Sequence, residues 1–149
     1  MNSVAVEMSR VEIAHLLTVA KEAIIYQLTL PSKGQEICFD VFGVPQKERF
    51  IINIFRGNIN SKKYNINARF SVNNVMLMQL HISPTNRHVN PNGDIIIGDH
   101  WHILDKDTGL KWAYPAENIQ SDDFVNNTIK FLDEFKVIKR PILSEQIEM

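Results

Sequence analysis

The sequence predicts an α+β fold: an antiparallel sheet of five or six strands with an N-terminal and a C-terminal helix packed on it. Apolar and polar residues alternate with period 2 through the middle of the chain, which predicts strands. Towards both ends, apolar residues recur at helical spacing instead. The 149 residues fit one domain, 1–149, with an ordered core of about 9–140.

The first helix is predicted to begin at Ser9, because Ser9 and Glu12 form an S-x-x-E capping box. An amphipathic helix of about 18 residues follows, and it ends before Pro31. His15, inside this helix, is interpreted as a surface or core-edge residue rather than a ligand. The apolar stripe of the helix consists of Ile13, Leu17, Ala20 and Ile24.

The next part of the chain predicts a series of strands. The alternating segments are residues 37–41, 50–54, 64–72 and 75–83. Asn73-Asn74 suits a tight hairpin between the last two, because asparagine tolerates positive φ. The polar face of the last strand carries His81.

Turn residues divide the following segment. Residues 85–98 are predicted to form a loop with a β-turn at 90–93. Two further strands, 100–104 and 110–114, are predicted to flank a hairpin loop.

The end of the chain predicts a second helix. Ser121 can cap it, and a buried stripe runs from Phe124 to Phe135. Beyond Pro141 the tail, including residues 144–149, is expected to fray.

The composition excludes several classes of protein. A net charge of −1 is neither that of a polycation for nucleic acid nor that of an acidic DNA mimic. The single cysteine, Cys38, excludes an internal disulfide framework and fits a reducing compartment. No apolar run approaches ~18 residues, so no membrane span is expected. Because the N-terminus also lacks the pattern of a signal peptide, the expected location is the cytoplasm.

A cluster of histidines is the feature that points to chemistry. Four of the five histidines, His81, His88, His100 and His102, lie within 22 residues of one another. Since a strand turns alternate side chains to one face, His100 and His102 point the same way, about 7 Å apart along the strand. If the strands that carry these histidines are neighbours, His81 joins them, and His88 and Asp94 reach in from the loop.

This arrangement predicts a metal site. Three or four nitrogen or oxygen ligands suit Zn²⁺, and the candidate ligands are His88, His100, His102, His81 and Asp94. Mn²⁺ and Ni²⁺ stay open as alternatives, because affinity alone does not select the metal. A polar groove in which the histidines only form hydrogen bonds is the other interpretation.

A catalytic role is a further alternative. Residues 81–83 read H-x-S, and phosphoesterases with two H-x-S/T motifs use paired histidines as acid and base. The second motif would be residues 100–102, which lack the hydroxyl, and this argues against that class. A metal-dependent hydrolase stays open, with a free zinc coordination position to activate water and Asp94 or Asp99 as base.

Basic residues form a second candidate surface for a partner. Arg56, Lys62, Lys63 and Arg69 span two strands and their connection, with asparagines among them. Such a face could contact phosphates or an acidic protein groove. An ordinary solvated sheet face is the alternative.

Five stretches between about Phe50 and Phe135 carry a resemblance. They are Leu80-His81-Ile82, His88-Val89-Asn90-Pro91-Asn92-Gly93-Asp94, His100-Trp101-His102, Lys111-Trp112-Ala113-Tyr114-Pro115 and Phe131-Leu132-Asp133-Glu134-Phe135. On these residues the chain resembles a family of small, uncharacterised phage and bacterial proteins with an H-x-N-P-x-G…H-x-H…K-W-A-x-P pattern. In that family aspartate often replaces His81 and glutamate often replaces Asp94. The resemblance therefore implies a bound cation around His88, His100 and His102.

The small size, the low alanine and glycine content and the abundance of Asn, Ile and Lys also look like those of a mobile-element protein from a low-GC host, expected in the cytoplasm of a bacterial host cell. In size and style the chain is similar to zinc-bearing anti-CRISPR inhibitors of Cas9-type nucleases. The leading hypothesis is a zinc-binding, non-enzymatic phage protein that blocks such a defence nuclease by binding it, and this protein contact is favoured over direct binding of nucleic acid. A metal-dependent hydrolase or nuclease, and a toxin–antitoxin or regulatory binding component, are the alternatives.

Overall fold

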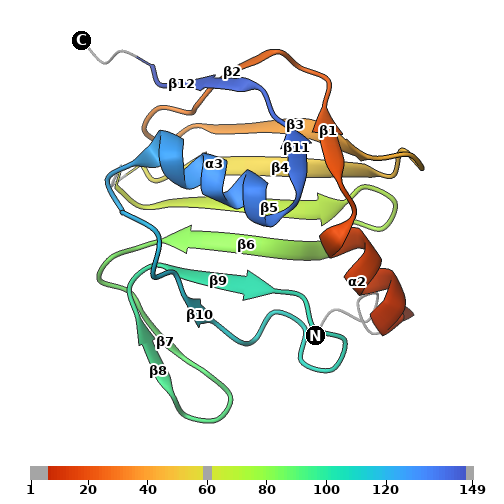
Figure 1. Ribbon diagram of the computed structural model, residues 1–149. Helices are drawn as coiled ribbons and strands as arrows, with labels where there is room; N and C mark the ends of the chain where they lie inside the picture. Colours follow the sequence, from red (N-terminus) through yellow and green to blue (C-terminus); the bar gives the residue numbers. More distant parts are fainter. Residues whose placement is uncertain (1–6, 59–61, 147–149) are drawn as a thin grey trace.

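The computed structural model describes residues 7–58 and 62–146, which form an α+β fold as predicted. The described helices are α2 (Arg10–Thr18) and α3 (Phe124–Glu134), and neither is long and apolar enough to cross a lipid bilayer. The main sheet has eight strands, in the spatial order β10 (Tyr114–Pro115), β9 (His100–Ile103), β6 (Met76–Ile82), β5 (Tyr64–Phe70), β4 (Arg49–Arg56), β3 (Glu36–Gly43), β1 (Lys21–Ala23) and β11 (Val137–Lys139) (Figure 1). Two short pairs complete the described fold: β2 (Gln27–Thr29) with β12 (Ile142–Ser144), and β7 (Arg87–Val89) with β8 (Ile95–Ile97).

The prediction of an antiparallel sheet of five or six strands is wrong in both the number of strands and their relative direction. The described strands form an eight-stranded mixed sheet, because β1 and β11 pair in parallel while the other neighbours are antiparallel. Both β1 and β11 have only three residues. So short a segment carries too few residues for a period-2 pattern to be recognised.

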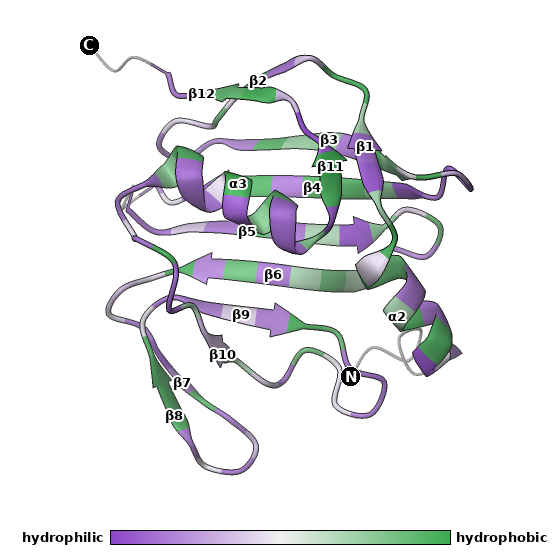
Figure 2. Ribbon diagram, viewed as in Figure 1, coloured by the Kyte–Doolittle hydropathy of each residue, from purple (hydrophilic) through white to green (hydrophobic). Residues whose placement is uncertain are grey.

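The register of the central strands gives the sheet one apolar face. Along β4 and β5 the even-numbered residues lie on this face, and Ile52 on it is fully buried. Helix α3 covers the face (Figure 1), with ring centroids 4.2 Å apart for Phe124 and Tyr64 and 6.0 Å apart for Phe131 and Trp101. Hydrophobic and hydrophilic residues alternate along the same strands in Figure 2, as a sheet with one buried face requires.

We call the opposite side of the sheet the polar face. Two rows of cross-strand partners run over it. One row is Asn53, Asn67, Gln79 and His102, and the other is Phe55, Asn65, His81 and His100. Directly opposite side chains on adjacent strands lie about 5 Å apart. The strand register alone therefore makes these polar groups neighbours.

The first helix is shorter than predicted. Ser9 caps it as expected, since the Ser9 hydroxyl accepts a hydrogen bond from the backbone N–H of Glu12 at 3.0 Å. The helix ends at Thr18, because the residues that follow form β1 between β3 and β11. Ile24, predicted on the helical stripe, is 78% exposed. Pairing with two strands thus outweighs a weak local preference for helix.

The segment between β6 and α3 also differs from the predictions. Residues 85–98 form the β7–β8 hairpin rather than a plain loop, while the predicted turn at 90–93 is present, with the Gly93 N–H donating to the Asn90 carbonyl at 2.8 Å. The predicted strand 110–114 is reduced to β10, which pairs with β9.

The last helix begins later than predicted. Asp123 caps it, because its carboxylate accepts from the Asn126 N–H at 3.1 Å, whereas the Ser121 hydroxyl donates to Asp99. The chain then continues into β11 and β12 instead of fraying after Pro141. Residues 147–149 of the predicted tail lie outside the described residues.

The ammonium group of Lys21 on β1 lies inside the core. The residue has no exposed surface, and its Nζ donates to the carbonyl oxygens of Phe135 and Val19 at 2.8 and 3.0 Å. The same Nζ lies 3.8 Å from the ring centroid of Phe135 and 4.9 Å from that of Phe50. Burial lowers the pKa of Lys21 to about 7, although the Glu48 carboxylate acts in the opposite direction.

Because of this burial, the unfolding free energy is expected to change with pH above about pH 7. An unfolded lysine titrates near about 10.4, so the unfolded chain binds more protons than the folded chain from about pH 7 upwards. We expect the unfolding free energy of the wild type to rise relative to Lys21→Met between about pH 7 and about pH 9, by up to about 1.4 kcal/mol per pH unit. Urea unfolding across this range measures it, with exposed Lys139 as the matched Lys139→Met control. A difference independent of pH would contradict the prediction.

Candidate metal centre

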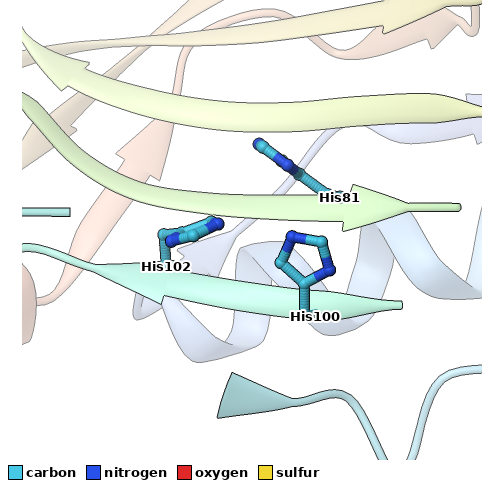
Figure 3. A group of neighbouring side chains, drawn as sticks. All are labelled: His81, His100 and His102. Atoms are coloured by element: carbon cyan, nitrogen blue, oxygen red, sulfur yellow. The ribbon is translucent and has the colours of Figure 1, made fainter. Parts of the chain in front are cut away.

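Strands β6 and β9 bring three of the predicted ligands together on the polar face (Figure 3). His81 lies directly opposite His100, and His102 follows two residues along β9. The ring centroids are 5.0 Å apart for His81 and His100, 5.1 Å for His81 and His102, and 5.0 Å for His100 and His102. One ring nitrogen from each lies within 4.8 Å of the other two. Strand alternation therefore predicted this grouping correctly.

Burial keeps the imidazoles of His81 and His102 in the form that binds metals. His100 and His102 are only 1% and 6% exposed, and His81 is half-buried. Burial lowers the pKa of His81 to about 4, and the neighbouring His102 and His100 lower it further. Burial also lowers the pKa of His102, with His100 adding to the effect. His81 and His102 are thus neutral at pH 7, with a lone pair available for a metal ion.

A hydrogen bond fixes the orientation of His100. Its Nδ1 lies 2.8 Å from the carbonyl oxygen of Gly98. Because a carbonyl oxygen only accepts, Nδ1 donates this bond, and in the neutral tautomer the lone pair is on Nε2. Metal-binding histidines commonly use such a bond from the second ring nitrogen to set the tautomer and the ring orientation.

His102 supplies a second sign that the cluster suits a cation. Its Nδ1 is buried and has no hydrogen-bond partner among the described residues. Leaving such a group unpaired costs about 1–3 kcal/mol. A tetrahedral zinc with bonds of about 2.1 Å places its ligand nitrogens about 3.4 Å apart. Since the three atoms already lie within 4.8 Å, small ring movements would complete the coordination.

Comparison with known proteins places the chain in a family. A model described as a family of unknown function, DUF6978, matches residues 8–137. The chain belongs to this family. No curated protein and no solved structure matches it significantly. The expectation of an uncharacterised family is confirmed, and the matched range includes the whole histidine cluster.

In this DUF6978 chain, His88 lies beside the three histidines on β7. Its ring centroid is 5.7 Å from that of His100 and 5.2 Å from that of His102. Its Nε2 donates to the carbonyl oxygen of Lys111 at 3.0 Å, and in the neutral tautomer the lone pair is on Nδ1. His88 is thus an additional imidazole at the cluster, outside the group of three ligand atoms.

The two predicted carboxylates are engaged elsewhere in the DUF6978 structure. Asp94 lies exposed in the turn of the β7–β8 hairpin, where its carboxylate accepts from the Asn92 side chain at 2.9 Å. Asp99 accepts from the Ser83 N–H at 2.8 Å and from the Ser121 hydroxyl at 2.5 Å. The structure therefore does not bring Asp94 to the three histidines, and the two oxygens of Asp99 accept from the Ser83 backbone and the Ser121 side chain.

Two hydrogen bonds between one side chain and the backbone of Ala113 hold the β7–β8 hairpin beside the cluster. The buried Asn90 side chain donates to the carbonyl oxygen of Ala113 at 3.0 Å and accepts from the Ala113 N–H at 2.8 Å. Together with the bond from His88 to Lys111, this fastens the hairpin to the segment before β10. Sequence analysis missed this role of Asn90, because a side chain that mimics a strand partner leaves no periodic pattern.

A groove of about 650 Å³ adjoins the cluster, and His81 forms part of its wall. Sequence analysis missed the groove as a whole. Its other polar lining residues are Asn58, Lys63, Asn65, Ser83 and Asn86, with Phe55 and Tyr64 as aromatic ones. The alternation of β5 could have indicated Asn65, which is the cross-strand partner of His81.

The four predicted partner-binding cations of the DUF6978 chain do not share one face. Arg56 has its guanidinium 5.1 Å from the ring centroid of Phe124, on the side of α3. Arg69 lies on the polar face, at the other end of β5. Lys62 and Lys63 are exposed in the connection before β5. The two arginines point to opposite sides because they occupy different faces of the alternating strands.

Proposed function

We propose that this chain is a zinc-binding, non-enzymatic protein that binds a protein partner. The observation that carries the proposal is the group of three ring nitrogens, from His81, His100 and His102, within 4.8 Å of one another. The neutral state of His81 and His102 and the unpaired Nδ1 of His102 support it. Imidazole nitrogens are ligands that zinc prefers, although Ni²⁺ and Cu²⁺ also accept them.

The role of the metal in this proposal is to stabilise the β7–β8 hairpin. A metal ion on β6 and β9 would lie beside His88, and His88 connects the hairpin to Lys111. The outer side of the hairpin carries Val89, Ile95 and Ile97, which are 54%, 47% and 71% exposed. A small apolar surface on a projecting hairpin suits contact with another protein. In this proposal the partner is a bacterial defence nuclease of the Cas9 type, and the support for that choice is the resemblance.

The test combines metal analysis with thermal unfolding. Protein purified without added metal is expected to contain close to one zinc per chain. Removing it with a chelator should lower the melting temperature, and adding zinc should restore it. If free zinc exceeds Kd about 100-fold, the metal adds about 2.7 kcal/mol of stability, or about 5–11 °C. Purified protein with no zinc and no response to added zinc would overturn the proposal.

The choice of partner has its own experiment. A Cas9-type nuclease from the native host should co-elute with the zinc-loaded protein and fail to co-elute with Ile97→Asp, which places a charge on the exposed side of the hairpin. Absence of co-elution with the wild type would remove this partner and leave the zinc site untouched.

A metal-dependent hydrolase is the second candidate, and the groove beside His81 favours it. Three protein ligands with an open fourth position are typical of catalytic zinc. The position of the carboxylates opposes it, because Asp99 is fully engaged and Asp94 lies in an exposed turn. A phosphodiesterase assay separates the two candidates: activity of the zinc-loaded wild type that disappears in His81→Ala would favour the hydrolase.

A further inference from the structure

The groove and the histidine cluster share one residue. His81 contributes a ring nitrogen to the group of three and also lines the groove. Its neighbour across the strand pair, Asn65, lies in the same groove, and Phe55 follows in the same row on the polar face. The groove therefore meets the cluster at His81, while the buried His100 and His102 lie on the neighbouring strand β9 and outside the groove lining.

The described wall of the groove carries a positive charge and no negative one. Its described lining residues include the ammonium group of Lys63, the amides of Asn58, Asn65 and Asn86, and the hydroxyl of Ser83. None of the described lining residues carries a carboxylate. The ammonium group of Lys63 only donates, and the amides and the hydroxyl can donate as well as accept. The positive charge, with no carboxylate among these residues, favours a ligand that carries negative charge and acceptor oxygens.

The fourth coordination position of the metal ion would connect the histidine cluster with the groove. Three histidines leave one place open on a tetrahedral ion, and His88 lies outside the group of three ligand nitrogens. We propose that the groove binds the phosphate group of a small molecule, with one phosphate oxygen occupying the open position on the metal. Lys63 and the groove amides then hold the remaining oxygens.

Phosphate fits this site better than a carboxylate does. A phosphate dianion brings two negative charges, which the metal ion and Lys63 can both balance. It also offers more terminal oxygens than a carboxylate to the three amides and the hydroxyl of the groove. The exposed ring of Phe55, 37% accessible, can pack on an apolar or aromatic substituent of the phosphate ester. The inference rests on the proposed metal site.

Calorimetry with inorganic phosphate tests the inference. The phosphate is titrated into full-length protein loaded with one Co²⁺ per chain. The equimolar loading avoids precipitation of phosphate by excess metal, and the visible spectrum of Co²⁺ reports a change in its ligands. We expect phosphate to bind and to change the cobalt spectrum. Lys63→Gln should weaken binding about tenfold, and Lys63→Glu should weaken it further. Lys139→Gln, at an exposed position on β11, is the matched control and should bind like the wild type.

Each other result contradicts a definite part of the inference. Equal affinity of the metal-free protein for phosphate, or an unchanged cobalt spectrum, would show that phosphate does not ligate the metal. Tighter binding of acetate than of phosphate would overturn the choice of phosphate. No binding by metal-loaded protein would overturn the site altogether. Failure of the protein to bind Co²⁺ or Zn²⁺ is a separate result, which overturns the proposed function itself.

Discussion

The variant His102→Ala is expected to lose zinc and, with it, the thermal stabilisation that zinc provides. His102 is 6% exposed and lies within 5.1 Å of both His81 and His100, measured between ring centroids. Even substitutions in the outer shell of metal sites reduce affinity about 10–100-fold, so removing a ligand should cost more than about 100-fold. The measurement is the zinc-induced shift in melting temperature, recorded for each variant with chelator and then with zinc.

The zinc-induced shift separates ligand loss from damage to packing. Truncating a buried imidazole lowers the melting temperature with or without metal, whereas only ligand loss removes the shift itself. His15→Ala is the matched control, because His15 lies on α2 with half of its side chain exposed. The control should keep the full shift. A normal shift in His102→Ala would mean that His102 is not a ligand.

The variant Phe131→Ala, in the buried stripe of α3, is expected to lose a large part of the unfolding free energy. Phe131 is fully buried and packs on Trp101 and Phe135, with ring centroids 6.0 and 6.3 Å apart. Removing a buried phenyl ring costs about 3–5 kcal/mol, since the cavity closes only in part. For a domain of this size the melting temperature should fall by about 6–20 °C.

Chemical unfolding of Phe131→Ala in the presence of chelator isolates this effect from metal binding. Phe55→Ala is the control, because Phe55 lies on the polar face and is 37% exposed. Its expected loss is below about 1.5 kcal/mol. A loss of less than about 1 kcal/mol in Phe131→Ala would contradict the packing of α3 on the sheet.

The central sheet could be predicted from the sequence because its strands are long and buried on one face. Residues 64–72 alternate through several cycles, and the structure places β5 there. The same reasoning failed at β1, where Lys21 pairs with both Gly43 and Val137. Those contacts come from distant parts of the chain, and no local pattern encodes them. The segments that were predicted wrongly are accordingly the short ones at the edges.

In the candidate site, too, the residues on long regular strands could be placed from the sequence and those in turns could not. His81, His100 and His102 could be grouped because strand alternation and one register decide their positions. The place of Asp94 could not be predicted in this way, since it depends on a turn that the Asn92 side chain stabilises. The groove was also invisible, because residues from three separate segments, such as Phe55, Lys63 and Asn86, come together only in the folded chain.

The pairing of β1 with β11 has a consequence for synthesis in the cell. Lys21 pairs with Val137, so the two partners are separated by 116 residues. At about 5–20 residues per second, the ribosome needs about 6–23 s to make the second partner after the first. Throughout that interval the growing chain has no β11 to pair with β1, and for most of it no α3 to cover the apolar face of the sheet. Unpaired strand edges attract other chains, so the nascent protein is most vulnerable to aggregation just before its last segment emerges.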